Sequence, residues 1–237
     1  IQMSMLPKKF PRSPERQDID VYGRLSPAKA VGGDLFDFYI CDEKLFFCIG
    51  DVSGKGVPAA LLMTVTKNLF RAVSAEETLP GQIATKMNAF MSENNDNAMF
   101  VTVFIGVLDL PTGVLHYCNG GHDAPIMISR ELEELTVKAN LPVGLMPGLA
   151  YEDQEVVIAP QTTLFLYTDG LTEAENKEKS LFGKERLKMA VCELMAEGDV
   201  SAQQLVEKVE EAVKAFVGDA EQSDDLTMLA LKYTGLS

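Results

Sequence analysis

Residues 45–63, LFFCIGDVSGKGVPAALLM, join two apolar segments through a glycine-containing turn that begins with a carboxylate, Asp51. The segment 45–52 is apolar almost throughout, which is typical of a strand that is buried on both faces. Pro58 suits the first turn of a helix, where its missing N–H costs no hydrogen bond. The stretch therefore predicts a buried strand, a turn that holds Asp51 at its mouth, and a helix.

The apolar residues of this helix recur at intervals that place them on one face. We expect that face to consist of Leu61, Leu62, Val65, Leu69 and Val73. A second helix is expected after Pro80, where helical spacing returns. Its apolar face is predicted to hold Ile83, Met87, Phe90 and Met91. We interpret Met63, Met87 and Met91 as core residues rather than as contacts for a cofactor.

The rest of the chain favours short strands separated by Gly, Pro and Asn turns, which is typical of antiparallel sheets. The predicted strands outside the opening stretch are 19–25, 99–110, 113–119, 124–129, 154–159, 162–169 and 226–233. Two more helices are predicted at 182–198 and 201–218, the second opened by a capping box of Ser201 and Gln204. Gly218 ends it. This order is not a strict βαβ alternation, and it predicts an α+β fold of two stacked antiparallel sheets flanked by helix pairs.

The first 18 residues differ from the remainder. Residues 1–6 are predicted to be the end of an upstream helix that Pro7 stops, and three prolines in 7–18 predict an extended linker. One domain is expected over 19–235, because no second linker or internal repeat follows. The chain begins with isoleucine, so we expect it to be the C-terminal domain of a longer protein that carries an upstream sensor domain.

The composition restricts the classes of partner. Asp and Glu outnumber Lys and Arg by 35 to 21, which gives a net charge of −14. Neither nucleic acid nor an anionic membrane is expected as a partner, because both attract basic faces; solubility alone also accounts for the acidity. The four cysteines form no CxxC pair and are expected to be buried free thiols in a reducing compartment, the cytoplasm. Two histidines are too few for a His-rich metal site.

Several aspartates share the position of Asp51, at the junction between a predicted strand and a loop. They are Asp34 after two glycines, Asp169 before Gly170, and the adjacent pair Asp224 and Asp225. Any one of them has an ordinary explanation, since Asp and Gly are common in turns. Together they favour a carboxylate site for Mg²⁺ or Mn²⁺, which take oxygen ligands. Two such ions clamp a phosphoryl group and lower the pKa of a bound water.

Two other motif readings fit less well. The segment 50–56 contains too few residues between its outer glycines for a P-loop, and Gly56 stands where Ser or Thr would bind magnesium. The segment VGGDLF at 31–36 has Leu35 where a GGDEF diguanylate cyclase has a second acid. Lys55 is interpreted as a solvated turn lysine, with attraction of a phosphate as the alternative.

Six motifs in order resemble the metal-dependent protein phosphatases of the protein phosphatase 2C superfamily, in the bacterial branch of SpoIIE and RsbU-type regulators. They are SPAKAVGGDLFD (26–37), IGDVSGKGVPAALLM (49–63), NGGHDAPIM (119–127), LPVGLMPG (141–148), LYTDGLTEAEN with LFG (166–183) and DDLTML (224–229). The resemblance covers about residues 20–233. It implies a ββ sandwich flanked by helices and hydrolysis of phosphoserine or phosphothreonine on a protein, usually a STAS-domain anti-sigma-factor antagonist.

The resemblance also implies the site residues. The metal ligands carried over are Asp34, Asp51, the Val52 carbonyl, Asp169 and Asp224, with Asp51 bridging two Mn²⁺ or Mg²⁺ ions. These aspartates act in catalysis through a water that the ions activate, so no side-chain nucleophile is implied. Gly170 and Asp225 are expected to support the ligands from outside. Apart from the resemblance, Glu173 is expected either to orient the ligands from outside or, equally, to cap or solvate a turn.

Two further polar residues and one competing function stay open. Lys29 either reaches the substrate phosphate or is a surface lysine, and His122 in its glycine turn is expected to stabilise the loop. The competing function is a catalytically silent or conditionally active interaction module of the same fold. In the conditional version, an upstream sensor dimerises the domain through the helix before Pro7, and the helix after Asp51 acts as the switch.

Overall fold

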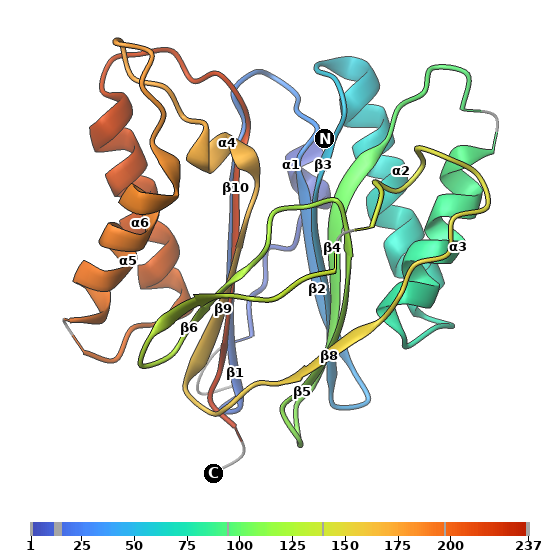
Figure 1. Ribbon diagram of the computed structural model, residues 1–237, viewed down its shortest axis with the longest axis horizontal. Coiled ribbons are helices and arrows are strands. Elements are labelled where there is room, and N and C mark those ends of the chain that lie inside the picture. Colours follow the sequence, from blue (N-terminus) through green and yellow to red (C-terminus); the bar gives the residue numbers. More distant parts are fainter. Residues whose placement is uncertain (1, 12–15, 94, 139, 197, 236–237) are drawn as a thin grey trace.

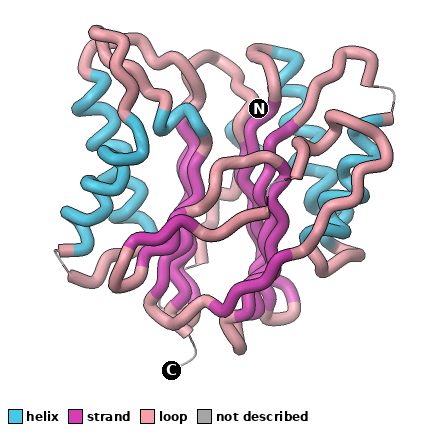
Figure 2. The backbone as a smooth tube through the Cα atoms, viewed as in Figure 1, coloured by secondary structure: helices cyan, strands magenta, loops and turns pink. Residues whose placement is uncertain are grey.

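The computed structural model describes residues 2–11, 16–93, 95–138, 140–196 and 198–235. Two five-stranded antiparallel sheets are stacked face to face, with one pair of helices outside each sheet (Figure 1). The backbone tube in Figure 2 shows the same four layers, helix–sheet–sheet–helix. The α+β sandwich that the sequence predicts is confirmed.

The two sheets, called sheet A and sheet B below, are listed in spatial order. Sheet A contains β1 (Ile19–Ser26), β10 (Leu226–Tyr233), β9 (Thr162–Tyr167), β6 (Ile126–Ile128) and β7 (Leu132–Glu134). Sheet B contains β2 (Leu35–Cys41), β3 (Lys44–Val52), β4 (Val101–Asp109), β5 (Val114–Gly120) and β8 (Gln154–Val157). The longer helices are α2 (Val57–Ser74), α3 (Pro80–Ser92), α5 (Gly183–Met195) and α6 (Ala202–Val217). Two short helices, α1 (Gln2–Met5) and α4 (Asp169–Thr172), complete the set.

Alternation along the strands of sheet A divides their side chains between two cores. In β10, Leu229 and Leu231 join the core between the sheets, whereas Met228 and Ala230 pack with α5 and α6. Successive strand residues point to opposite faces, so a strand covered on both sides is apolar throughout. β3 is such a strand, as the sequence predicts, and its residues from Leu45 to Ile49 are all buried.

The predicted inner face of α2 is confirmed only in part, since Val73 is buried and Leu62 and Leu69 pack against the core. Leu61 and Val65 are 65% and 47% exposed. The buried face consists of Ala59, Met63, Thr66, Phe70, Val73 and Ser74. Because this face includes small and polar residues, the apolar spacing in the sequence does not reveal it. The buried Thr66 hydroxyl donates to the Leu62 carbonyl at 2.8 Å. The prediction that Met63, Met87 and Met91 belong to the core is confirmed.

The predicted face of α3 needs one correction, because Phe90 is 61% exposed. Asn88 faces inward instead, and its side chain accepts from Gly144 N at 2.8 Å and donates to the Met146 carbonyl at 3.0 Å. These bonds satisfy a buried amide. They fix the rotation of α3 about its axis and turn Phe90 to the surface.

The cysteines also differ from expectation in part. All four are free thiols, and Cys48 and Cys118 are buried as predicted. Cys41 and Cys192 are exposed. Cys41 is the last residue of β2, beside the turn to β3, and Cys192 lies on the outer side of α5, so neither position enters a core.

The N-terminal segment lies against sheet A and sheet B rather than apart from them. Phe10 stacks between Tyr22 and Phe38, with ring centroids 4.9 and 5.6 Å away. The Pro11 carbonyl accepts from Val21 N at 3.1 Å. Pro14 of the predicted linker lies outside the described residues.

A buried ion pair, which the sequence analysis did not identify, ties α2 to β2. The Asp37 side chain is fully buried and accepts from Arg71 Nε at 2.5 Å, and Arg71 donates a second bond to the other carboxylate oxygen at 2.6 Å. Lys67 Nζ lies 3.2 Å from the same carboxylate. The Arg71 guanidinium also covers the Tyr39 ring, 4.4 Å from its centroid.

Within the described residues, no helix is long and apolar enough to cross a membrane.

Candidate functional site

The predicted aspartates lie near the ends of elements, at the end of the sandwich where α4 follows β9 (Figure 1). Asp34 and Asp224 precede β2 and β10, Asp51 is the second-last residue of β3, and Asp169 is the first residue of α4. Asp34 is the most buried of the predicted carboxylate ligands, at 3% exposure. It precedes β2, and its carboxylate accepts from the Thr168 hydroxyl at 2.7 Å. Burial, and next the charge of Asp51, raise the pKa of Asp34 well above its usual range. Asp34 and Asp51 are therefore electrostatic neighbours, although 17 positions separate them in the sequence.

The absence of a side chain at Gly33 brings the loop before Asp34 close to the end of β3. A Cβ atom at Gly33 would lie 2.9 Å from the Val52 carbonyl oxygen and 3.3 Å from the Asp51 carboxylate. Asp51 itself is half-buried. Burial and the charge of Asp169 raise its pKa to about 7. The Val52 carbonyl and the Asp51 carboxylate therefore lie against the loop that carries Asp34.

The absence of a side chain at Gly170 likewise lets the segments that carry Asp169 and Asp224 approach each other. A Cβ atom at Gly170 would lie 1.9 Å from the Asp225 carbonyl oxygen and 3.4 Å from the Asp224 side chain. Asp169 faces solvent. Partial loss of hydration, followed by the charges of Glu173 and Asp224, raises its pKa. Any larger residue at Gly170 would force these loops apart.

Asp225 is buried and holds the loop before Asp34 in place. One carboxylate oxygen accepts from Ala28 N at 2.9 Å. The other leaves no room for a side chain at Gly32, since a Cβ atom there would lie 1.6 Å away. The side chain of Gln2 in α1 also binds the Gly32 backbone, donating to its carbonyl at 2.6 Å and accepting from its N–H at 3.2 Å.

Lys55 is exposed, as expected of a turn lysine, and it is also paired. Its ammonium donates to the Asp224 carboxylate at 2.7 Å and to the Ser223 carbonyl at 3.2 Å. The bond with Asp224 raises the pKa of Lys55. Lys55 therefore joins the turn after Asp51 to the loop before β10, and it supplies a positive charge to the outer edge of the carboxylate cluster.

The four carboxylates fit divalent cations in donor type and in charge. Asp34, Asp51 and Asp169 all have raised pKa values because neighbouring negative charges add to their burial. A bound cation offsets the repulsion among such carboxylates, and Mg²⁺ and Mn²⁺ take hard oxygen donors. Among the described residues, however, no three His, Cys, Asp or Glu side chains already converge as ligands around one point. The loops bring the donors together without closing them into a finished ligand set.

Lys29 and Glu173 lie at the edge of this cluster, and both are exposed. Lys29 lines a small pocket together with Lys55, Gly56 and Asp224. Glu173 N donates to the Asp169 carbonyl at 2.7 Å, and its charge raises the pKa of Asp169. Neither contact identifies a ligand or substrate role.

His122 lies beneath the cluster and bridges the two sheets. Its Nδ1 lies 3.1 Å from the Thr102 hydroxyl of β4, and its Nε2 lies 3.1 Å from the Tyr167 carbonyl of β9. A carbonyl only accepts, so Nε2 carries the proton and Nδ1 accepts from Thr102. Burial lowers the pKa of His122 to about 4. The ring is therefore a neutral structural bridge at neutral pH.

We predict that His122 makes the fold sensitive to acid. The unfolded histidine binds a proton near pH 6.5, whereas the folded one resists it down to about pH 4. Stability is thus fully present above pH 6.5 and falls as the pH drops toward 4, by about 2–3 kcal/mol at 1.36 kcal/mol per pKa unit. Urea unfolding at pH 7 and 4.5 measures it. The stability advantage of wild type over His122→Gln should shrink on acidification. An advantage that is constant with pH would contradict this role.

Comparison with known proteins was made for sequence and for structure. The sequence model of the family described as Stage II sporulation protein E (SpoIIE) matches residues 41–234. Protein IcfG of Synechocystis sp. is 30% identical over 98% of this chain, which spans 40% of that relative's length. Phosphoserine phosphatase RsbU of Bacillus subtilis is 26% identical over 98% of this chain and 68% of its own.

The PP2C domain of SiaA from Pseudomonas aeruginosa has a similar structure. The two superpose with a TM-score of 0.76 and 22% identity, over 90% of this chain and 85% of that one. At this identity the likeness establishes a shared fold, and it agrees with the stacked sheets and paired helices described above.

Proposed function

Because the chain belongs to the family described as stage II sporulation protein E (SpoIIE), we propose that it is a metal-dependent protein phosphatase. Its reaction is hydrolysis of phosphoserine or phosphothreonine on a regulatory protein. The observation that carries the proposal is the cluster of Asp34, Asp51, Asp169 and Asp224 at one end of the sandwich, where burial and then neighbouring negative charges raise the pKa values of the first three. The RsbU relative, named a phosphoserine phosphatase, supports the class of substrate.

In the proposed mechanism, Asp34, Asp51, Asp169, Asp224 and the Val52 carbonyl would hold two Mn²⁺ or Mg²⁺ ions. When bound, such ions lower the pKa of water and offset negative charge on a phosphoryl group. The residues of this chain contribute position: Thr168 orients Asp34 through its 2.7 Å hydrogen bond. Asp225 fixes the loop before Asp34 through Ala28, and Gly170 lets the loops of Asp169 and Asp224 meet. Glu173 adds negative charge beside Asp169.

Lys55 and Lys29 are the cations nearest to where a phosphoryl group would approach. Lys55 is 2.7 Å from Asp224 and is exposed, so it is placed to hold the loop in register and to attract an anion. Lys29 borders the same small pocket, which makes it the second candidate for binding substrate phosphate.

For the substrate, the proposal is a serine-phosphorylated STAS-domain protein of the anti-sigma-factor antagonist class. Residues 19–235 are proposed to form the phosphatase domain and residues 1–18 to connect it to an upstream sensor, in the cytoplasm. The contact of Gln2 with Gly32 provides a physical link between that connection and the carboxylate cluster. A homodimer is part of the conditional version of the proposal, in which the isolated domain awaits activation.

The first test is hydrolysis of p-nitrophenyl phosphate by the 237-residue chain with Mn²⁺, with Mg²⁺ and with EDTA. Turnover is expected with a divalent ion and not with EDTA. Asp169→Asn should abolish it, because the variant removes a charged ligand while keeping the shape of the side chain. Asp123→Asn is the matched control, since the Asp123 charge also reaches Asp169 but lies outside the proposed ligand set.

The possible outcomes distinguish an active phosphatase from a conditionally active domain and from a catalytically silent interaction module. Equal turnover by wild type and Asp169→Asn would refute the assigned site. Absence of turnover by wild type, combined with calorimetric binding of Mn²⁺ that Asp169→Asn removes, would favour a domain that awaits its activator. Absence of both would favour a catalytically silent interaction module.

A further inference from the structure

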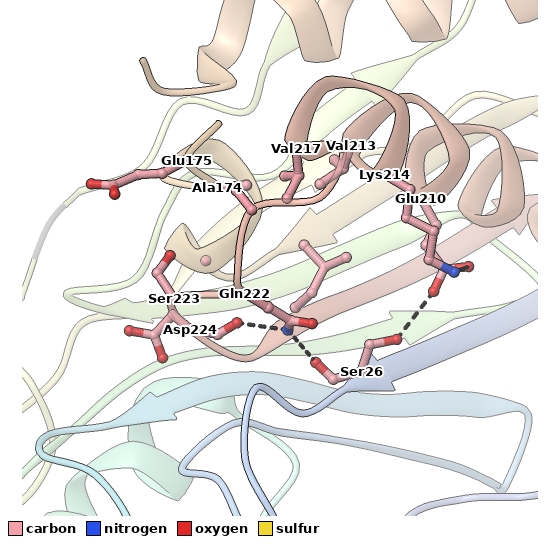
Figure 3. Close-up of a pocket in the computed structure, with 14 residues that line it drawn as sticks. Ser26, Ala174, Glu175, Glu210, Val213, Lys214, Val217, Gln222, Ser223 and Asp224 are labelled. Carbon is pink, nitrogen blue, oxygen red and sulfur yellow. Dashed lines mark hydrogen bonds and ion pairs between the residues drawn. The ribbon is translucent and has the colours of Figure 1, made fainter. Parts of the chain in front are cut away.

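A second cavity opens beside the carboxylate cluster, between α6, the segment after α4 and the loop before β10 (Figure 3). Its apolar wall is formed by Ala174, Val213, Val217 and Leu226. Of these, Ala174, Val213 and Leu226 are buried from solvent at 8%, 4% and 5% exposure. The cavity therefore offers an apolar floor within a protein whose outer surface is acidic.

Two polar side chains of the wall, Glu210 and Gln222, already have partners. Glu210, with a side chain 5% exposed, pairs with Arg24 at 3.0 Å and Lys214 at 3.1 Å. It also accepts from the Ser26 hydroxyl at 3.1 Å. Gln222 closes another side by donating to the Ser26 carbonyl at 2.8 Å and the Asp224 carbonyl at 2.7 Å. Because the buried carboxylate has two cationic partners, a charged ligand would find no unbalanced partner there.

The cavity borders the candidate active site. Gly170 and Asp224 line it, and both take part in the packing of the carboxylate loops. Its volume is about 190 Å³. That is smaller than the roughly 300–1,000 Å³ of sites that bind whole drug-sized ligands. The size suits one amino-acid side chain, and successive residues of a bound chain are about 3.8 Å apart.

We propose that this cavity binds an uncharged aliphatic side chain located one or two residues from the phosphorylated residue of the protein substrate. The assignment rests on the proposed phosphatase function and adds a specificity pocket to it. Burial of an aliphatic group against Val213, Val217 and Leu226 is favourable, whereas a charged group would lose its hydration without gaining a partner. The pocket would thus select among phosphoproteins by the sequence beside the phosphoserine.

The test uses phosphoserine peptides in which one position at a time is varied. The varied positions are the two residues before and the two residues after the phosphoserine. Glycine, leucine, lysine or aspartate occupies that position, and kcat/KM is measured by phosphate release with Mn²⁺. At one position, leucine should exceed glycine by about tenfold, the scale expected of a hydrophobic specificity pocket. Lysine and aspartate should not exceed glycine. Turnover of p-nitrophenyl phosphate, which lacks flanking residues, provides the reference.

A filling variant and a matched control locate the effect. Ala220 lines the cavity and is partly exposed, so Ala220→Leu should remove the leucine preference while p-nitrophenyl phosphate turnover stays unchanged. Ala215→Leu, at an exposed position on α6 outside the cavity wall, should keep the preference. Equal kcat/KM for leucine and glycine peptides would overturn the pocket, as would a lysine or aspartate preference. Absence of p-nitrophenyl phosphate turnover by wild type would instead show that the chain alone lacks the phosphatase activity on which the pocket rests.

Discussion

Asp51→Asn is expected to have opposite effects on activity and stability. Metal-dependent turnover should fall by about 10²–10³-fold, because a ligand shared by two cations contributes several kcal/mol at about 1.36 kcal/mol per factor of ten. In EDTA the same variant should unfold at a higher temperature than wild type. Its carboxylate lies among Asp169, Asp224 and Asp225, whose charges raise its pKa, so removing the charge relieves repulsion. Phosphate release and thermal unfolding at pH 8 measure the two effects.

A control distinguishes this from a general effect of charge removal. Asp219 pairs with Lys177 at the surface, where its side chain is 91% exposed. Asp219→Asn should change neither turnover nor the unfolding temperature appreciably, because an exposed pair contributes about 0–1 kcal/mol. An Asp51→Asn protein that loses stability in EDTA would show that the carboxylate is a structural partner rather than one of several mutually repelling ligands.

The second large effect is expected at Arg71, whose two bonds to the buried Asp37 tie α2 to β2. Arg71→Leu should lower the free energy of unfolding by about 2–4 kcal/mol, which is below the full cost of an orphaned buried charge because Lys67 remains as a partner. Loss of the guanidinium over the Tyr39 ring adds to the effect. Urea unfolding in EDTA measures the change.

The double variant tests the cause. If the cost arises from leaving Asp37 buried without its main partner, Asp37→Leu combined with Arg71→Leu should recover much of the lost stability. Arg130→Ala at an exposed position serves as the control and should change stability by less than about 0.5 kcal/mol. A double variant less stable than Arg71→Leu alone would show that the pair is favourable in itself.

The sequence predicts the parts of the fold that depend on local pattern. β10 occupies 226–233, the bounds predicted from the mostly apolar segment LTMLALKY, and α6 begins with the Ser201 and Gln204 capping box and ends at Gly218. β2 and β7 were not predicted. β2 carries Asp37 in its interior, a residue that strands avoid, and the buried pair with Arg71 that permits it lies 34 positions away. β7 is three residues of LEE, too short and acidic to show a strand pattern.

In the candidate site, too, some features follow from local sequence pattern and others depend on tertiary contacts. Strand-end aspartates are visible in the sequence, but their partners depend on tertiary contacts. Lys55 pairs with Asp224 across 169 positions, and Thr168 binds Asp34 across 134. The face of α2 was mispredicted in part for a related reason. Apolar residues follow both sides of that helix, so spacing alone does not decide which side meets sheet B, leaving Leu61 exposed.

The most direct test of the central claim is phosphate release from a serine-phosphorylated STAS-domain protein by the 237-residue wild-type chain. The measurement compares Mn²⁺ with EDTA and runs Asp34→Asn in parallel. The phosphatase account predicts stoichiometric phosphate release with Mn²⁺, none in EDTA and little or none from Asp34→Asn. Release that continues in EDTA, or that Asp34→Asn leaves intact with Mn²⁺, would contradict it.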